Sequence, residues 1–169
     1  PQLMAEQPEA YCAMGITAEN VAEQYGITRQ MQDEFAVESH RRAAEARASG
    51  KFAQEIIPVE AVTTYQDEAG CTRMGKVTVT EDEGIRPQTT MESLAKLRTV
   101  FKLGGSVTAG NASQTSDGAA FVVLMSAEKA AALGLKPIAK FISFAVAGVP
   151  AELMGTGPIA AIPKALKLA

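Results

Sequence analysis

The spacing of apolar and polar residues predicts two helices near the start of the chain. Residues 17–25 have the features of a short helix, with Thr17 as its cap, Glu19 in its first turn and Gly26 as its stop. A longer helix is predicted over residues 28–50, where helix-forming residues run between a threonine and a glycine.

A β-hairpin and a further helix are predicted next. Residues 55–65 are rich in β-branched side chains and predict a strand, which Pro58 restricts to an edge or a bent position. Residues 76–82 alternate again and predict the partner strand across a polar turn. The helix that follows is expected to have its cap at Thr89 or Thr90.

The pattern changes after a long stretch of small and polar residues at 104–120, which is typical of a functional loop. The continuous apolar runs at 119–126 and 136–149 predict strands covered on both faces. A short helix is expected between them, and a last helix follows the sequence MGTGP, with Pro163 making its first turns irregular.

These elements predict two parts and an α/β fold class. Residues 1–105 resemble a helix-rich α+β segment, and residues 106–169 resemble a β-α-β-α portion of a larger layered sheet. Two strands cannot satisfy their own edges or bury both faces. The second part is therefore expected to depend on protein that this sequence does not contain.

Composition narrows the classes of function. Hydrophobic residues make up 47% and the net charge is −3, which argue for a globular fold and against a nucleic-acid partner. No apolar run approaches the about 18 residues that span a membrane, and no secretory signal is visible, so we expect no membrane partner and a reducing cytoplasmic location. Cys12 and Cys71 make neither a disulfide framework nor a zinc site, and no metal is expected.

Four segments, in the same order along the chain, carry a resemblance to a known family. The loop TAGNASQTSDGAAFVVLMS resembles the thiolase segment in which a T-A-G-N-(A/S)-S loop runs into a strand. The motifs I-R-P-x-T-T-M and S-Q-x-S-D-G make the chain most similar to the degradative 3-ketoacyl-CoA thiolases of fatty-acid β-oxidation and lipid metabolism. The four matching segments are residues 14–43, 82–101, 108–126 and 147–166.

The resemblance implies a thiolase-like α/β fold and an acyl transfer between 3-ketoacyl-CoA and CoA, in either direction. Residues 1–105 would be the loop domain that covers the CoA. Residues 106–169 would be a partial core, with the last strand of the first half and the first strand and helix of the second. The family's nucleophilic cysteine lies upstream of the matched region and its other catalytic motifs lie downstream. Cys12, Cys71 and His40 stand outside those motifs, so we expect no catalytic residue here, and we read His40 as a solvated helix position.

Seven residues match positions at which the family contacts CoA, which would be a substrate rather than a cofactor. Near the pantetheine and acyl part the resemblance places Met14, Ala109, Ser113 and Met154, and near the nucleotide end it places Arg86 and Ser93. Phe101 would pack on the pantetheine or on the adenine. Simple chemistry agrees, because a Gly/Ser/Asn loop lets backbone approach the pantetheine and cations suit phosphates. The cations of this region are Arg86, Lys96, Arg98 and Lys102.

Two readings of the chain remain open. It is either the central part of an active thiolase, with the rest of a thiolase or a homo-oligomer as partner, or a non-catalytic fragment that binds CoA or a partner thiolase. A third interpretation, a small interaction domain unrelated to thiolases, would require that four matches in the same order arose by chance. The presence of the missing catalytic motifs in a co-purifying chain would decide for the first reading.

Overall fold

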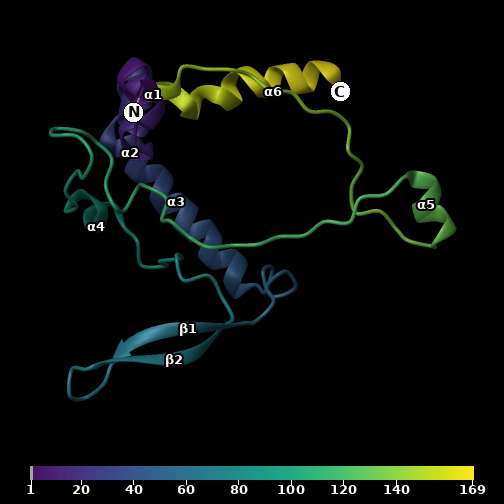
Figure 1. Ribbon diagram of the computed structural model, residues 1–169, viewed down its shortest axis with the longest axis horizontal. Coiled ribbons are helices and arrows are strands. Elements are labelled where there is room, and N and C mark those ends of the chain that lie inside the picture. The colour runs from purple at the N-terminus through teal and green to yellow at the C-terminus, as the bar shows by residue number, and fades with distance from the viewer. Residues whose placement is uncertain (1) are drawn as a thin grey trace. The chain divides into compact units, whose positions relative to one another are not determined.

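The computed structural model describes residues 2–169. Their contacts form two compact units, one made of the residues up to Thr28 together with Thr99–Ala169, the other of Arg29–Arg98 (Figure 1). This grouping differs from a boundary near residue 105, because the first helices pack with the later segments of the chain. The division into a loop domain, residues 1–105, and a partial core, residues 106–169, stays a prediction.

The first unit holds most of the helices. They are α1 (Gln2–Glu6), η1 (Pro8–Tyr11), α2 (Met14–Tyr25), α5 (Ala127–Ala132), η2 (Ala151–Thr156) and α6 (Gly157–Leu168).

Helix α2 begins one turn earlier than predicted. Ala13 occupies the N-cap position, and the Thr17 hydroxyl donates to the Met14 carbonyl at 2.8 Å instead of capping the helix. The predicted cap is wrong because threonine side chains also bond back to a carbonyl within a helix. Gly26 ends α2 in the left-handed region with φ 63°, as predicted.

Two segments that are distant in sequence pack against α2. Helix η2 lies along it, and the Asn20 side chain donates to the Glu152 carbonyl at 3.2 Å. Residues 99–108 form a second support, in which Thr99 and Thr108 make an isolated antiparallel bridge. Thr108 is fully buried, so this bridge lies at the centre of the small core.

The second unit contains α3 (Arg29–Ala48), β1 (Val59–Gln66), β2 (Thr72–Val79) and α4 (Met91–Ala95). The predicted hairpin is confirmed: β1 and β2 pair antiparallel, from Val59 opposite Val79 to Gln66 opposite Thr72. Strand β1 starts directly after Pro58, which cannot donate to the ladder. The Asp67 carboxylate closes the turn by accepting from the N–H groups of Ala69 and Cys71.

The two predicted buried strands do not form. Residues 113–126 and 135–150 have no regular secondary structure, and Figure 1 shows no strand arrows there. Phe121 is 96% exposed and Ile138 is fully exposed. A strand needs a neighbouring strand for its backbone hydrogen bonds, and none of the described residues provides one for these two segments.

Candidate functional site

The loop that follows the Thr99–Thr108 bridge is held by its own side chains. The Asn111 carboxamide accepts from the Thr108 N–H at 2.7 Å and donates to the Ser106 carbonyl at 3.1 Å. The Thr108 hydroxyl accepts from the Gly110 N–H, and the Thr108 carbonyl accepts from the N–H of Ala112. These bonds fix the backbone of residues 106–112 without any regular element.

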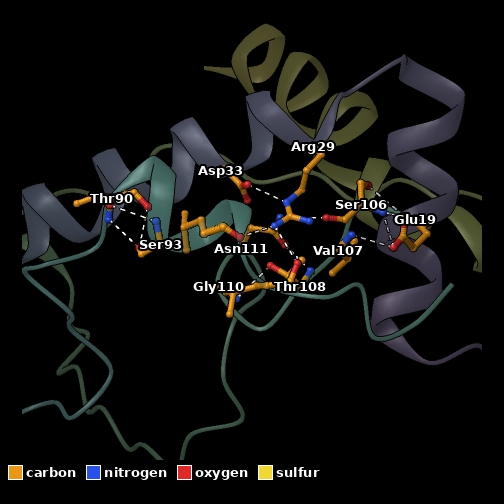
Figure 2. A network of polar contacts seen from close by, with 12 residues as sticks. Glu19, Arg29, Asp33, Thr90, Ser93, Ser106, Val107, Thr108, Gly110 and Asn111 are labelled. Carbon is orange, nitrogen blue, oxygen red and sulfur yellow. Dashed lines mark hydrogen bonds and ion pairs between the residues drawn. The ribbon is translucent and has the colours of Figure 1, made fainter. Parts of the chain in front are cut away.

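A buried carboxylate from α2 holds the start of this loop. Glu19 is 4% exposed, and it accepts from the Ser106 N–H at 2.9 Å, the Ser106 hydroxyl at 3.1 Å and the Val107 N–H at 2.8 Å (Figure 2). Burial raises the pKa of Glu19, but these hydrogen bonds and the charge of Lys102 outweigh it and hold the pKa below its ordinary value. Glu19 is therefore a carboxylate near neutral pH.

Three of the predicted CoA-contacting residues lie on α2 itself or on segments that pack against it. Met14 is the first residue of α2, Met154 belongs to η2, and Phe101 precedes the loop. All three side chains are exposed. The Phe101 ring packs against the backbone of Gly15, where an added Cβ would lie 2.2 Å from the ring. Gly15 therefore fixes where Phe101 presents its exposed face.

Ala109 and Ser113 lie within or next to the fixed loop. Both are exposed, and Ala109 stands directly between the bonded residues Thr108 and Gly110. The Ser113 hydroxyl donates to the Gln114 carbonyl at 3.2 Å, which leaves its lone pairs open to a donor from a ligand.

Arg86 belongs to the second unit, where the backbone around it is ordered by a turn. Its carbonyl accepts from the N–H and the hydroxyl of Thr89, at 3.1 and 2.8 Å. Its own N–H donates to Nδ1 of His40 at 3.3 Å. His40 is therefore not simply a solvated position: it is half-buried and supports this turn. The Arg86 guanidinium is exposed.

Ser93 is the N3 residue of a capping box on α4. Its hydroxyl accepts from the Thr90 N–H at 3.0 Å and donates to the Thr90 carbonyl at 2.8 Å, while the Thr90 hydroxyl accepts from the Ser93 N–H (Figure 2). The predicted cap at Thr90 is confirmed. Because the Ser93 proton is already used, only a remaining lone pair is free for a nucleotide donor.

Helix α4 is also attached to α3 by an arginine that the sequence did not single out. Arg29 donates from Nε to Asp33 at 2.7 Å, and from Nη2 to the carbonyls of Leu94 and Leu97 (Figure 2). The Leu94 carbonyl lies in the last turn of α4, where it also accepts from the Leu97 N–H at 2.9 Å, and Leu97 follows the helix. The available sequence signal was the Arg–Asp pair four residues apart on a predicted helix.

The basic stretch is divided between the two units. Arg86, Lys96 and Arg98 are exposed in the second unit, and among the described residues none of them forms an ion pair. Lys102, in the first unit, pairs with Glu23 at 2.6 Å. That contact and the nearby Glu19 raise the pKa of Lys102. Three cations therefore remain open to a phosphate.

Other kinds of site receive little support from the described part of the chain. Within residues 2–169, no cluster of three or more His, Cys, Asp or Glu side chains is arranged to hold a metal ion. No helix among these residues has the length and apolar character needed to cross a membrane. An open apolar hollow between α6 and residues 144–146 contains none of the predicted CoA-contacting residues.

Comparison with known proteins decides the family. The family model of the thiolase N-terminal domain matches residues 3–128. The chain belongs to the thiolase family. It is 56% identical over 99% of its length to the 3-ketoacyl-CoA thiolase of Bacillus subtilis, and 52% identical over 99% to the human peroxisomal 3-ketoacyl-CoA thiolase. It covers 43% and 39% of these two proteins, so it spans about two fifths of their length.

Solved structures confirm the thiolase-like α/β fold class. The crystal structure of the Bacillus anthracis acetyl-CoA acetyltransferase matches 91% of the chain with a TM-score of 0.80 and 45% identity, and the chain covers 37% of it. The acetyl-CoA acetyltransferase of Syntrophomonas wolfei matches 96% with a TM-score of 0.76 and 38% identity, and the chain covers 38% of it. The chain therefore follows a thiolase-like path, although residues 113–126 and 135–150 form no strands.

Proposed function

We propose that this thiolase chain forms the central, CoA-binding part of an enzyme that transfers an acyl group between a 3-ketoacyl-CoA and CoA. The observation that carries the proposal is the 56% identity, along nearly the whole chain, to a protein named 3-ketoacyl-CoA thiolase. In the degradative direction, the bond between the α and β carbons of the 3-ketoacyl group breaks. The shortened acyl group goes to the sulfur of CoA, and acetyl-CoA leaves. The reverse condensation uses the same site.

We further propose that other parts of the protein supply the catalytic groups. The reaction needs a thiolate nucleophile, a histidine that takes a thiol proton and a second cysteine that protonates the leaving enolate. Cys12 is half-buried, and Cys71 is exposed at the base of the hairpin turn. His40 is engaged with the Arg86 N–H. None of the three stands in a catalytic motif of the family.

The fixed loop at residues 106–112 supports the pantetheine part of the proposal. CoA is long and thin there, with two amides that need donors and acceptors at defined places. A loop whose backbone is fixed by its own side chains offers Ala109 and Ser113 without an ordering cost at binding. The exposed apolar side chains of Met14, Phe101 and Met154 are suited to contact the rest of the pantetheine and the acyl part.

Arg86 and Ser93 support the nucleotide part. An exposed guanidinium with no ion-pair partner among the described residues can form charge-assisted hydrogen bonds to a phosphate. Its backbone is held by His40 and Thr89, so the side chain starts from a fixed point. Ser93 can accept one further hydrogen bond.

A second candidate function is a non-catalytic fragment that binds CoA or a partner thiolase. It is favoured by the exposed apolar segments, whose Phe121 and Ile138 side chains lack any cover among the described residues. CoA binding by this chain belongs to the first candidate and to one form of the second. They differ in whether the rest of a thiolase completes an active enzyme with it.

Calorimetric titration of the purified chain with CoA, together with a thiolysis assay on acetoacetyl-CoA, tests the proposal. We expect CoA binding that weakens about tenfold in Arg86→Ala, the equivalent of losing one charge-assisted hydrogen bond. Ser113→Ala is expected to weaken it less. Arg42→Ala and Ser49→Ala are matched controls, because both side chains are exposed on the polar side of α3 or at its end.

Each outcome of this titration has a defined meaning. Binding without turnover supports a CoA-binding thiolase part that lacks the catalytic groups. No binding by the wild-type chain refutes the CoA-binding role of the isolated chain. Turnover by a homogeneous chain would show that the catalytic groups are present after all. Restored turnover when the missing thiolase segments are added favours the first candidate over the second.

A further inference from the structure

A carboxylate buried under the loop is the feature that the proposed reaction leaves unused. Glu19 is the only acidic side chain on the buried face of α2, which it shares with Gly15 and Ala22 at helical spacing. Its two oxygens receive three donors, which all come from Ser106 and Val107. A carboxylate suits this place because it can only accept hydrogen bonds, and two successive backbone N–H groups donate to it.

The surroundings show that this contact is built and not incidental. Gly105 lies so close that an added Cβ would be 2.3 Å from Glu19 Oε1. Only a glycine at this position lets the backbone approach the carboxylate closely. Of the two donor residues, Val107 is buried at 5% exposure and Ser106 is half-buried. A buried N–H that loses such an acceptor is costly, so the loop start is strongly bound to α2.

The bound segment continues directly into the residues proposed to contact CoA. From Val107 the chain passes to the buried Thr108, whose N–H and carbonyl are tied to the Asn111 turn. Ala109 lies inside that turn. The position of its backbone therefore follows from two anchors, the Asn111 carboxamide within the loop and the Glu19 carboxylate beneath it.

We propose that Glu19 is a positioning residue of the coenzyme A site, whose buried carboxylate fixes residues 105–108 and thereby sets where Ala109 and Ser113 meet the pantetheine. The inference rests on the proposed CoA-binding function and deepens it. Glu19 itself touches no substrate atom in this scheme. Its effect is on the pantetheine part of the ligand, and the nucleotide part, proposed to meet Arg86 and Ser93, is not influenced.

Because the inference affects only the pantetheine part of CoA, comparing CoA with a ligand that lacks this part provides the test. Glu19→Gln keeps the size of the side chain but turns an N–H₂ toward backbone donors, and Glu19→Asp keeps the charge with a shorter reach. The probes are CoA and adenosine 3′,5′-bisphosphate, which lacks the pantetheine. Glu34→Gln is the matched control, since it removes an exposed carboxylate that pairs only with Gln30 along α3.

We expect Glu19→Gln to weaken CoA binding about tenfold, which corresponds to about 1.4 kcal/mol. Adenosine 3′,5′-bisphosphate should bind the variant as it binds the wild type. Glu19→Asp should recover part of the loss, and Glu34→Gln should change neither affinity. Hydrogen exchange at the Ser106 and Val107 amides should accelerate in Glu19→Gln, while the far-ultraviolet circular dichroism of the helices is kept.

Four results would overturn the inference. Equal CoA affinity in Glu19→Gln and wild type removes the positioning role and leaves the proposed function standing. Equal weakening of both probes shows a general structural role instead. Unchanged exchange at Ser106 and Val107 shows that the contact does not hold the loop, whether or not CoA binds. Failure of the wild-type chain to bind CoA refutes the CoA-binding role of the isolated chain, and the inference with it.

Discussion

Replacement of Gly105 by alanine tests the packing of the loop against α2 in its simplest form. Gly105 is not one of the glycines with positive φ, so alanine suits its backbone and by itself would stabilise by about 0.4–1 kcal/mol. The added Cβ, however, would lie 2.3 Å from Glu19 Oε1 and 2.8 Å from Oε2. The carboxylate has to move by about 1 Å to reach an ordinary contact of about 3.5 Å.

That movement stretches the hydrogen bonds from the Ser106 and Val107 N–H groups beyond useful length. A hydrogen bond to a charged group contributes about 1.5–3 kcal/mol. After the backbone gain is subtracted, we expect Gly105→Ala to destabilise the loop by about 1–2 kcal/mol. Gly118→Ala is the matched control, because nothing lies within 4 Å of its added Cβ.

A double-mutant cycle measures whether Glu19 is the cause. In a Glu19→Ala background the clash is gone, so Gly105→Ala should be neutral or slightly stabilising. Urea denaturation gives the free energies of unfolding, and exchange at the Ser106 and Val107 amides gives the local effect. An equal loss in both backgrounds would refute the reasoning, since the steric partner would then not be the carboxylate.

Three further predictions concern the same units. Gly15→Ala should displace the Phe101 ring, cost about 1–3 kcal/mol as overpacking and weaken CoA binding; unchanged melting and affinity would contradict this. Thr90→Ala removes half of the capping box with Ser93 and should cost about 0.5–2 kcal/mol, seen as faster exchange at the Ser93 amide; wild-type exchange there would argue against the cap. The pKa of Glu19 is depressed in the folded state, so its contribution to stability is complete above the ordinary value of 4.5 and is lost as pH falls through the depressed pKa. Urea midpoints from pH 6 down to about 2 should show this acid loss in the wild type and not in Glu19→Gln, and equal profiles would exclude it.

Local signals in the sequence were sufficient for most of the elements. Gly26 ends α2 and Thr90 begins α4, as their residue types predict, because caps act within a few residues. The hairpin followed from alternation and a polar turn. The strands predicted at 119–126 and 136–149 fail for the opposite reason, since the apolar pattern reports burial and says nothing of which partner provides it.

The arrangement around Glu19 was beyond local reasoning. In the sequence it reads as an acidic residue in the first turn of a helix, which is favourable there without any partner. Its partners Ser106 and Val107 lie 87 and 88 residues away. A signal was nevertheless present, because Gly15, Glu19 and Ala22 share a helix face, and a charged residue between small apolar ones on one face indicates a buried carboxylate.

The contact between Glu19 and Val107 also closes a ring of 88 residues of chain. The entropy lost on closing such a ring grows only with the logarithm of its length, so doubling it costs about 0.6 kcal/mol. Insertions or deletions between the two anchors are therefore cheap for this contact, while a single substitution at either anchor is not. The contact itself therefore sets no length for the intervening stretch, and during synthesis the ring can close only after residue 107 has left the ribosome.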